Sequence, residues 1–224
     1  MIYLLMEHNN ESLRNAVQLY LSDQELAIET YGPIEKWKTS NVTDMSNMFH
    51  NAREFNKNIG TWETRNVIDM SNMFHNAREF NKDIGAWKTG NVTNMRGMFW
   101  CAYKFNQDIG VWETRNVTDM SGMFYHACDF LQDIGAWEIG NLTNIYHIIN
   151  NTKLSKEMKK YNYEKKDCFD KEKMSIVFTY KRRKSFMHFL VENGFEPLNN
   201  EMLIENEHPI FDTHDLNYHI MSFL

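Results

Sequence analysis

A unit of 25 residues repeats along this chain without insertion or deletion. The first clear copy spans residues 41–65, and further copies begin at Asn66, Asn91 and Asn116. A degenerate fifth copy begins at Asn141. A fixed period in this range is typical of stacked repeats, in which each unit buries its apolar side chains against its neighbours. The repeat therefore predicts the architecture directly, whereas it says little about what molecule the protein binds.

The apolar positions within the repeat predict its local structure. Counted from the first Asn of each copy, they are positions 2, 5, 8, 9, 12, 15, 19 and 22. The spacing from position 5 to position 15 puts Met, Phe and Ala on one face of a short helix. We expect the Gly at position 20 to adopt a positive φ, and the Trp at position 22 to begin a short parallel strand. We also expect the Asn at position 1 to bond the backbone of the next copy. The fold class predicted is an α/β repeat solenoid.

The recurring pattern N-V-T-D-M-S-x-M-F-x-x-A-x-x-F-N-x-D-I-G-x-W-x-T resembles the BspA-like leucine-rich-repeat family in its mycoplasma-type 25-residue form. This family form is also found in large DNA viruses. The resemblance covers residues 12–152 and implies a leucine-rich-repeat-like solenoid that binds proteins or mediates adhesion without catalysis. Many bacterial members are secreted or lipid-anchored, but the opening MIYLLMEHNN does not have the features of a signal peptide. We therefore expect an intracellular protein, located in the host cell or virion if a virus encodes it.

Three segments are expected from the pattern. Residues 1–40 form a helical N-terminal cap with a partial repeat, in which Ser12 is the expected N-cap and a break falls near Ser22. Residues 41–152 hold the four repeats and the degenerate fifth. Residues 153–224 are predicted to be mainly helical, first basic and then acidic. Such charge asymmetry is typical of a docking surface or a tail.

The C-terminal segment supports two further hypotheses. Nucleic-acid binding would use the basic residues 153–185. Within them the basic patch consists of Lys181, Arg182, Arg183 and Lys184, which is typical of a nuclear-localisation or nucleic-acid-binding segment. The simpler interpretation is a solvated helix face that pairs with the acidic residues after it. The last dozen residues resemble the opening helix of F-box-like modules, which implies an adaptor that recruits cellular machinery. Protein binding, adaptor function and nucleic-acid binding therefore all remain open at this point.

Functional residues are expected at the outward positions where the copies differ. Several of these positions have aromatic side chains, and exposed aromatic side chains are enriched at protein interfaces. The alternative interpretation is that they pack against the C-terminal segment. The candidate protein-binding residues are His75, Trp100, Tyr103, Tyr125 and His126.

No sequence feature predicts an active site, a cofactor or a metal centre. His50 and His75 could face each other on adjacent copies and bind a metal, but two solvated histidines are the simpler interpretation. Asp and Asn at position 18 indicate Asx-turns, and charges of mostly opposite sign at position 23 suggest pairs between copies. The odd number and irregular spacing of Cys101, Cys128 and Cys168 argue against a disulfide framework or zinc site. No apolar run approaches the length of a membrane span.

Overall fold

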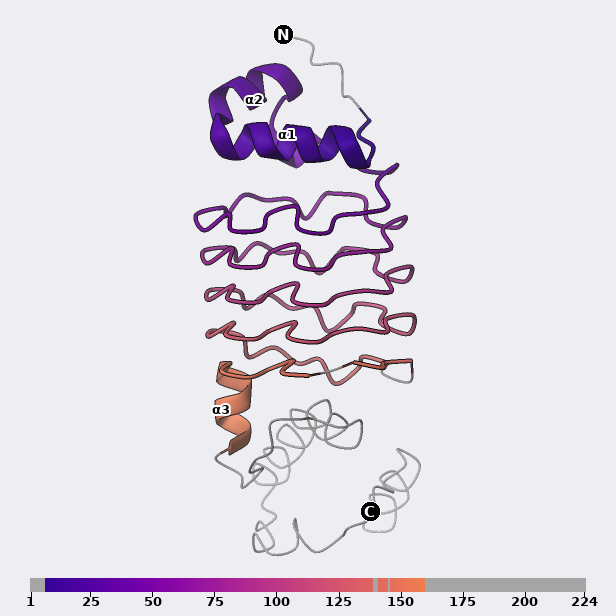
Figure 1. The fold of residues 1–224 in the computed structure, drawn as a ribbon, viewed down its shortest axis with the longest axis vertical. Helices are drawn as coiled ribbons and strands as arrows, with labels where there is room; N and C mark the ends of the chain where they lie inside the picture. Colours follow the sequence, from indigo (N-terminus) through magenta and orange to yellow (C-terminus); the bar gives the residue numbers. More distant parts are fainter. Residues whose placement is uncertain (1–6, 139–140, 145, 160–224) are drawn as a thin grey trace, which may run out of the picture. The chain divides into compact units, whose positions relative to one another are not determined.

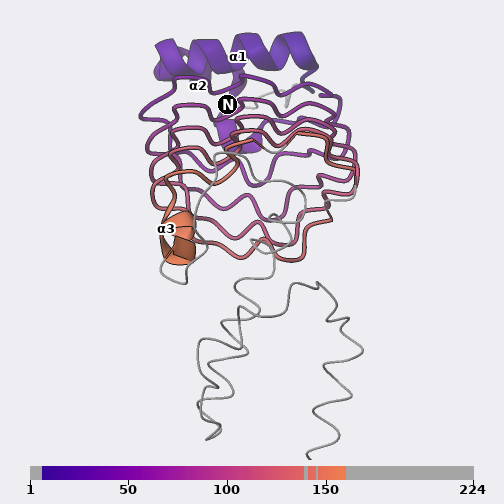
Figure 2. The ribbon, with the colours of Figure 1, turned by 60° about the horizontal axis from the view of Figure 1, so that its bottom comes forward.

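The computed structural model describes residues 7–138, 141–144 and 146–159, all within one unit of the chain, Met1–Lys181. The named elements are α1 (Asn10–Ser22), α2 (Gln24–Tyr31), the short 3₁₀-helix η1 (Ile34–Lys36) and α3 (Lys153–Lys159). Between η1 and α3 the chain winds through successive coils that lie one below another (Figure 1). Both views place α1 against the first coil and α3 at the opposite end of the stack (Figure 2). We number the coils 1 to 5, and they begin at Asn41, Asn66, Asn91, Asn116 and Asn141.

Backbone hydrogen bonds between corresponding positions join each coil to the next. One parallel β-bridge links position 4 of adjacent coils, as in the bridge between Asp69 and Asn94. The N–H groups at positions 5, 7, 9 and 11 donate to carbonyl oxygens of the following coil. For example, the N–H of Phe74 donates to the carbonyl oxygen of Met98 at 2.8 Å. Because the same bonds recur at every boundary, the register of the stack follows the repeat period.

The coils contain turns where the sequence predicted a short helix and a short strand. In the described residues, the only helices are α1, α2, η1 and α3, and pairing between coils is limited to isolated bridges. Turn hydrogen bonds close over three residues, as from the N–H of Ala77 to the carbonyl oxygen of Phe74 at 3.0 Å. Positions 7 and 11 have positive φ, which interrupts a right-handed helix after one turn. These residues are Asn47, Asn51, Asn72, Asn76, Gly97, Cys101, Gly122, His126, His147 and Asn151.

Rows of aromatic side chains fill the interior. The Phe rings at position 9 stack from coil to coil, with centroids 5.5 Å apart for Phe49 and Phe74. Each of them also stacks on the Phe at position 15 of its own coil, as Phe99 does on Phe105 at 3.8 Å. A third row consists of the buried Trp rings at position 22. Since each aromatic side chain buries about 150–250 Å², these rows contribute much of the apolar area that stabilises the stack.

Side-chain amides satisfy polar groups between the coils. The position-1 amide does bond backbone between the coils, but toward the N-terminus rather than to the next coil as predicted: Asn91 Nδ2 donates to the carbonyl oxygen of Arg65, 26 residues earlier, at 2.8 Å. A second row, which the sequence did not reveal, stands at position 16. There Asn81 Oδ1 accepts from the backbone N–H of Asn106 at 3.0 Å. The predicted Asx-turns at position 18 are also confirmed, with Asp83 Oδ1 accepting from the N–H two residues later at 2.8 Å.

The Gly at position 20 is needed for a reason that the sequence analysis did not identify. The predicted positive φ is wrong, because Gly60, Gly85 and Gly110 are not among the residues with positive φ. Instead, a Cβ on Gly85 would lie 2.8 Å from the carbonyl oxygen of Asp108 in the next coil. Two backbones therefore approach each other more closely than any side chain permits.

The N-terminal helices cover one end of the stack. Asn9, rather than the predicted Ser12, is the N-cap of α1. Its side chain accepts from the backbone N–H of Ser12, and the Ser12 side chain accepts from the backbone N–H of Asn9, which is a capping box. Asp23 separates α1 from α2 and caps the second helix, so the predicted break is confirmed. The Arg14 guanidinium donates to the carbonyl oxygen of Ser46 at 2.6 Å. This end of the stack is thereby closed by a helix that also satisfies backbone acceptors of coil 1.

The C-terminal segment is described only at its beginning. Leu154 of α3 is buried, and its N–H donates to the carbonyl oxygen of Phe130 at 3.0 Å. The basic patch of residues 181–184, the acidic residues after it and the F-box-like helix lie outside the described residues.

We expect Gly85→Ala to lower stability, because the new Cβ would meet the carbonyl oxygen of Asp108. Overpacking of this kind costs about 1–3 kcal/mol. Gly90→Ala is the matched control, since its Cβ would meet only the flexible end of the Glu113 side chain. Urea unfolding of the full chain measures both variants. Equal midpoints for the two would show that the close backbone approach does not govern position 20.

We expect stability to fall in mild acid through His8, whose side chain is 1% exposed. Burial lowers the pKa of His8 below its ordinary value of 6.5. As the pH falls, the unfolded chain therefore takes up this proton first, and stability is lost as the pH passes 6.5 and approaches the folded pKa. In His8→Phe, which preserves an aromatic ring beside Trp37, Tm should change less between pH 7.5 and 5.5, about one unit either side of the ordinary value. An identical pH dependence would contradict this.

Candidate functional site

Four of the outward-varying side chains form a continuous row on one edge of the stack. They occupy position 10 of coils 1 to 4, and we call this row the aromatic edge: His50, His75, Trp100 and Tyr125. Neighbouring ring centroids are 4.7, 5.8 and 4.2 Å apart along the row. His50 is exposed and the other three are half-buried. The structure therefore brings three of the predicted binding residues, His75, Trp100 and Tyr125, into one surface.

The Trp100 ring is held in place by its neighbours along the stack. It is nearly parallel to the His75 ring, with an angle of 19° between the planes. A Cβ on Gly122, at position 7 of the next coil, would lie 2.6 Å from two carbon atoms of the Trp100 ring. Coils 1 and 2 have Asn at position 7, whereas coils 3 and 4 have Gly. Because Gly122 has no side chain, it leaves the space that the Trp100 ring occupies.

Of the remaining two predicted residues, His126 borders the aromatic edge and Tyr103 contacts Arg78. The His126 ring lies 4.5 Å from that of Tyr125, and its Nε2 is 3.1 Å from Asn151 Nδ2. The Arg78 guanidinium lies 5.2 Å from the centroid of the Tyr103 ring, which is a cation–π contact. The alternative interpretation is that these side chains pack against the C-terminal segment. Beyond residue 159 that segment lies outside the described part of the chain.

His75 is electrostatically unusual within the edge. Its Nδ1 is buried and has no hydrogen-bond partner in the structure. Burial lowers the pKa of His75, and the neighbouring His50 lowers it further. The imidazole is therefore neutral at pH 7 with one polar atom unsatisfied, a state that is unfavourable unless a ligand or partner reaches it. The interpretation as two solvated histidines describes His50 but not His75.

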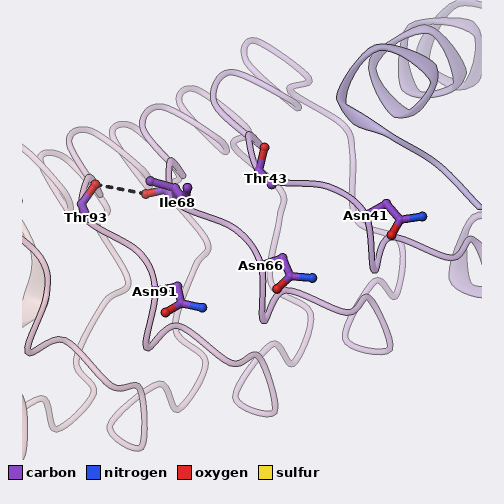
Figure 3. A pocket seen from close by; sticks show the side chains of 6 residues that line it. All are labelled: Asn41, Thr43, Asn66, Ile68, Asn91 and Thr93. Carbon is purple, nitrogen blue, oxygen red and sulfur yellow. Dashed lines mark hydrogen bonds between the residues drawn. The ribbon is translucent and has the colours of Figure 1, made fainter.

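A shallow groove on another face was not predicted from the sequence. It has a volume of ≈ 560 Å³ and crosses coils 1 to 3 at positions 1 and 3. Figure 3 shows its lining side chains, which are Asn41, Thr43, Asn66, Ile68, Asn91 and Thr93. Thr93 donates to the carbonyl oxygen of Ile68, the contact dashed in Figure 3. Asn66 and Asn91 donate to the carbonyl oxygens of Ser40 and Arg65, each 26 residues earlier in the chain. The signal that the sequence offered is Ile68, an apolar residue that is 50% exposed where four other copies have Thr.

The other sequence interpretations concern charge, metal and membrane. Charges at position 23 do not form ion pairs between coils in the described residues, so that prediction is wrong. Glu113 instead pairs with Arg115 of its own coil at 3.5 Å, because its exposed side chain reaches the nearer cation. No group of three or more His, Cys, Asp or Glu side chains in the described ranges could hold a metal ion. None of the described helices is long and apolar enough to span a membrane.

Comparison with known families identifies the repeat. Two overlapping segments, residues 20–115 and 86–183, match the model of the family described as "Mycoplasma protein of unknown function, DUF285". No curated protein and no solved structure matches the chain. The two matches together include every coil and extend through α3.

We expect Gly122 and Trp100 to be energetically coupled. Gly122→Asn restores the residue of coils 1 and 2, which tolerates a positive φ, but its Cβ would clash with the Trp100 ring. In a Trp100→His background the clash is absent, so the same change should cost less. Overpacking costs about 1–3 kcal/mol, and a double-mutant cycle on urea midpoints should give a coupling of similar size. Additive effects would show that the glycine is unrelated to the tryptophan.

Proposed function

We propose that this chain, which belongs to the DUF285 family of mycoplasma repeat proteins, is a non-enzymatic protein-interaction module. We further propose that its coils form a leucine-rich-repeat-like solenoid of the BspA-like class, acting inside the cell. The family match supports the repeat character of the chain. The BspA-like class and the location are hypotheses that rest on the sequence pattern.

The aromatic edge is the observation that carries this proposal. Trp and Tyr are the side chains that contribute most often to binding hot spots. Stacking fixes the Trp100 ring before any partner arrives, so little side-chain entropy is lost on binding. The stack itself does not demand these residues, because coils 1 and 2 have His at the same position. A partner is therefore the simplest reason for their presence in coils 3 and 4.

The chemistry of the described surface supports a binding role rather than a catalytic one. The groove is lined by uncharged Asn, Thr and Ile side chains, none of which is a general acid or base at neutral pH. The pKa shifts of His8 and Tyr20 are caused mainly by burial, and these residues belong to the N-terminal cap. We therefore propose that the chain uses no cofactor for catalysis.

The adaptor and nucleic-acid hypotheses depend chiefly on residues 160–224, outside the described part of the chain. Neither has a structural observation in its favour, and both stay predictions. Binding through the basic patch would weaken steeply with rising salt, because released counterions drive such association. Removal of residues 205–224 would abolish recruitment by an adaptor and leave binding at the aromatic edge intact.

We expect Trp100→His together with Tyr125→His to weaken partner binding at least tenfold. Both changes install the residue of coils 1 and 2, so the free energy of unfolding should fall by about 1 kcal/mol or less. Tm should therefore fall by only a few degrees. Pull-downs from the native source identify the partner, and titration of the purified partner gives Kd for each variant.

Ile68→Thr is the matched control, because it restores the repeat's own residue on the groove and leaves the aromatic edge unchanged. It should bind as the wild type does. If instead Ile68→Thr weakens binding and the double variant does not, the partner binds the groove and the aromatic edge is structural.

A further inference from the structure

Two imidazoles on adjacent coils lie close enough to share one ligand. The ring centroids of His50 and His75 are 4.7 Å apart, and the ring planes are inclined by 67°. The two residues are one repeat apart, and the backbone on which they stand is held by coil-to-coil bonds such as that from the N–H of Phe49 to the carbonyl oxygen of Met73 at 2.8 Å. Their separation is therefore fixed by the stack and not by a flexible loop.

This separation suits joint coordination of a metal ion. Two imidazoles bound to one tetrahedral Zn²⁺ through bonds of about 2.0–2.1 Å have ring centroids roughly 5 Å apart. The exposed His50 can turn about its side-chain bonds to direct a nitrogen at the ion, whereas His75 is held between two rings. The ring spacing thus requires little backbone rearrangement.

The unsatisfied nitrogen of His75 is a second and independent observation. Its Nδ1 is buried without a hydrogen-bond partner, although buried polar atoms are nearly always paired. The neutral imidazole is the form that binds metals. The Trp100 ring is stacked on the His75 ring, and the His50 ring lies edge-on to it on the other side.

We propose that His50 and His75 together bind a divalent transition-metal ion of the class that prefers imidazole, such as Zn²⁺, Ni²⁺ or Cu²⁺. Two protein ligands leave the other coordination positions to water or to a partner's side chains. The ion would link coil 1 to coil 2. This inference is independent of the proposed protein-binding function, since metal binding is measured without any partner.

The test is calorimetric titration of the full chain with Zn²⁺ at neutral pH. We expect the wild type to bind one Zn²⁺ per chain at this site. His50→Ala should abolish this binding event or raise its Kd at least tenfold. His50 is exposed, so this variant retains the fold. His75→Tyr should have the same effect while preserving a stacked ring, because coil 4 already has Tyr at this position. Zn²⁺ should also raise the Tm of the wild type and leave that of both variants nearly unchanged.

His147→Asn is the control for adventitious binding to a histidine that lies beside Tyr125, at the other end of the aromatic edge. Asn occupies this position in coils 1 and 2 and adopts the same positive φ there, so the backbone is not strained. This variant should bind Zn²⁺ as the wild type does. If both His50→Ala and His75→Tyr bind like the wild type, or if His147→Asn loses as much affinity as they do, the proposal is wrong and the binding is adventitious.

Discussion

Hydrogen bonding between corresponding positions of adjacent coils is the constraint on which the rest of this structure depends. Each coil offers the next the same donors and acceptors at the same places, from the bridge at position 4 to the N–H at position 11. Phe can stack on Phe and Trp on Trp only while this register holds. One inserted residue would shift every later pair, and this explains physically why the copies share one length.

The same constraint determines which residues the turns tolerate. A coil closes because positions 7 and 11 adopt positive φ, a conformation that Asn and Gly accept readily and other residues accept at a cost. Cys101 and His126 stand at position 11 with φ of 55° and 58°. Unfavourable backbone conformations persist where the surroundings hold them, and here they border the aromatic edge. The residues that strain the backbone are thus on the same surface as those that break the repetition.

The inward side chains could be predicted from the sequence because burial depends on period and hydrophobicity alone. The turns could not, since the helical spacing from Met70 to Phe80 says nothing of the positive φ at Asn72 and Asn76. Position 20 was misinterpreted for a similar reason: a close backbone approach and a left-handed turn both demand Gly. Four of the five predicted site residues do gather on one surface, because copies stacked in register align their variable positions. The groove was missed because its Asn side chains bond the stack as well as line a surface.

A repeat array separates structural from functional residues more clearly than most folds do. Identical neighbours give an internal standard, so any residue that departs from the standard without loss of packing requires another explanation. Trp100 departs, and Gly122 departs with it to make room. We expect these two changes in adjacent coils to be coupled, because the Trp100 ring and a Cβ at residue 122 would occupy the same space. Their coordination argues that the array was altered locally to present a large aromatic ring at this edge while the stack below it stayed the same.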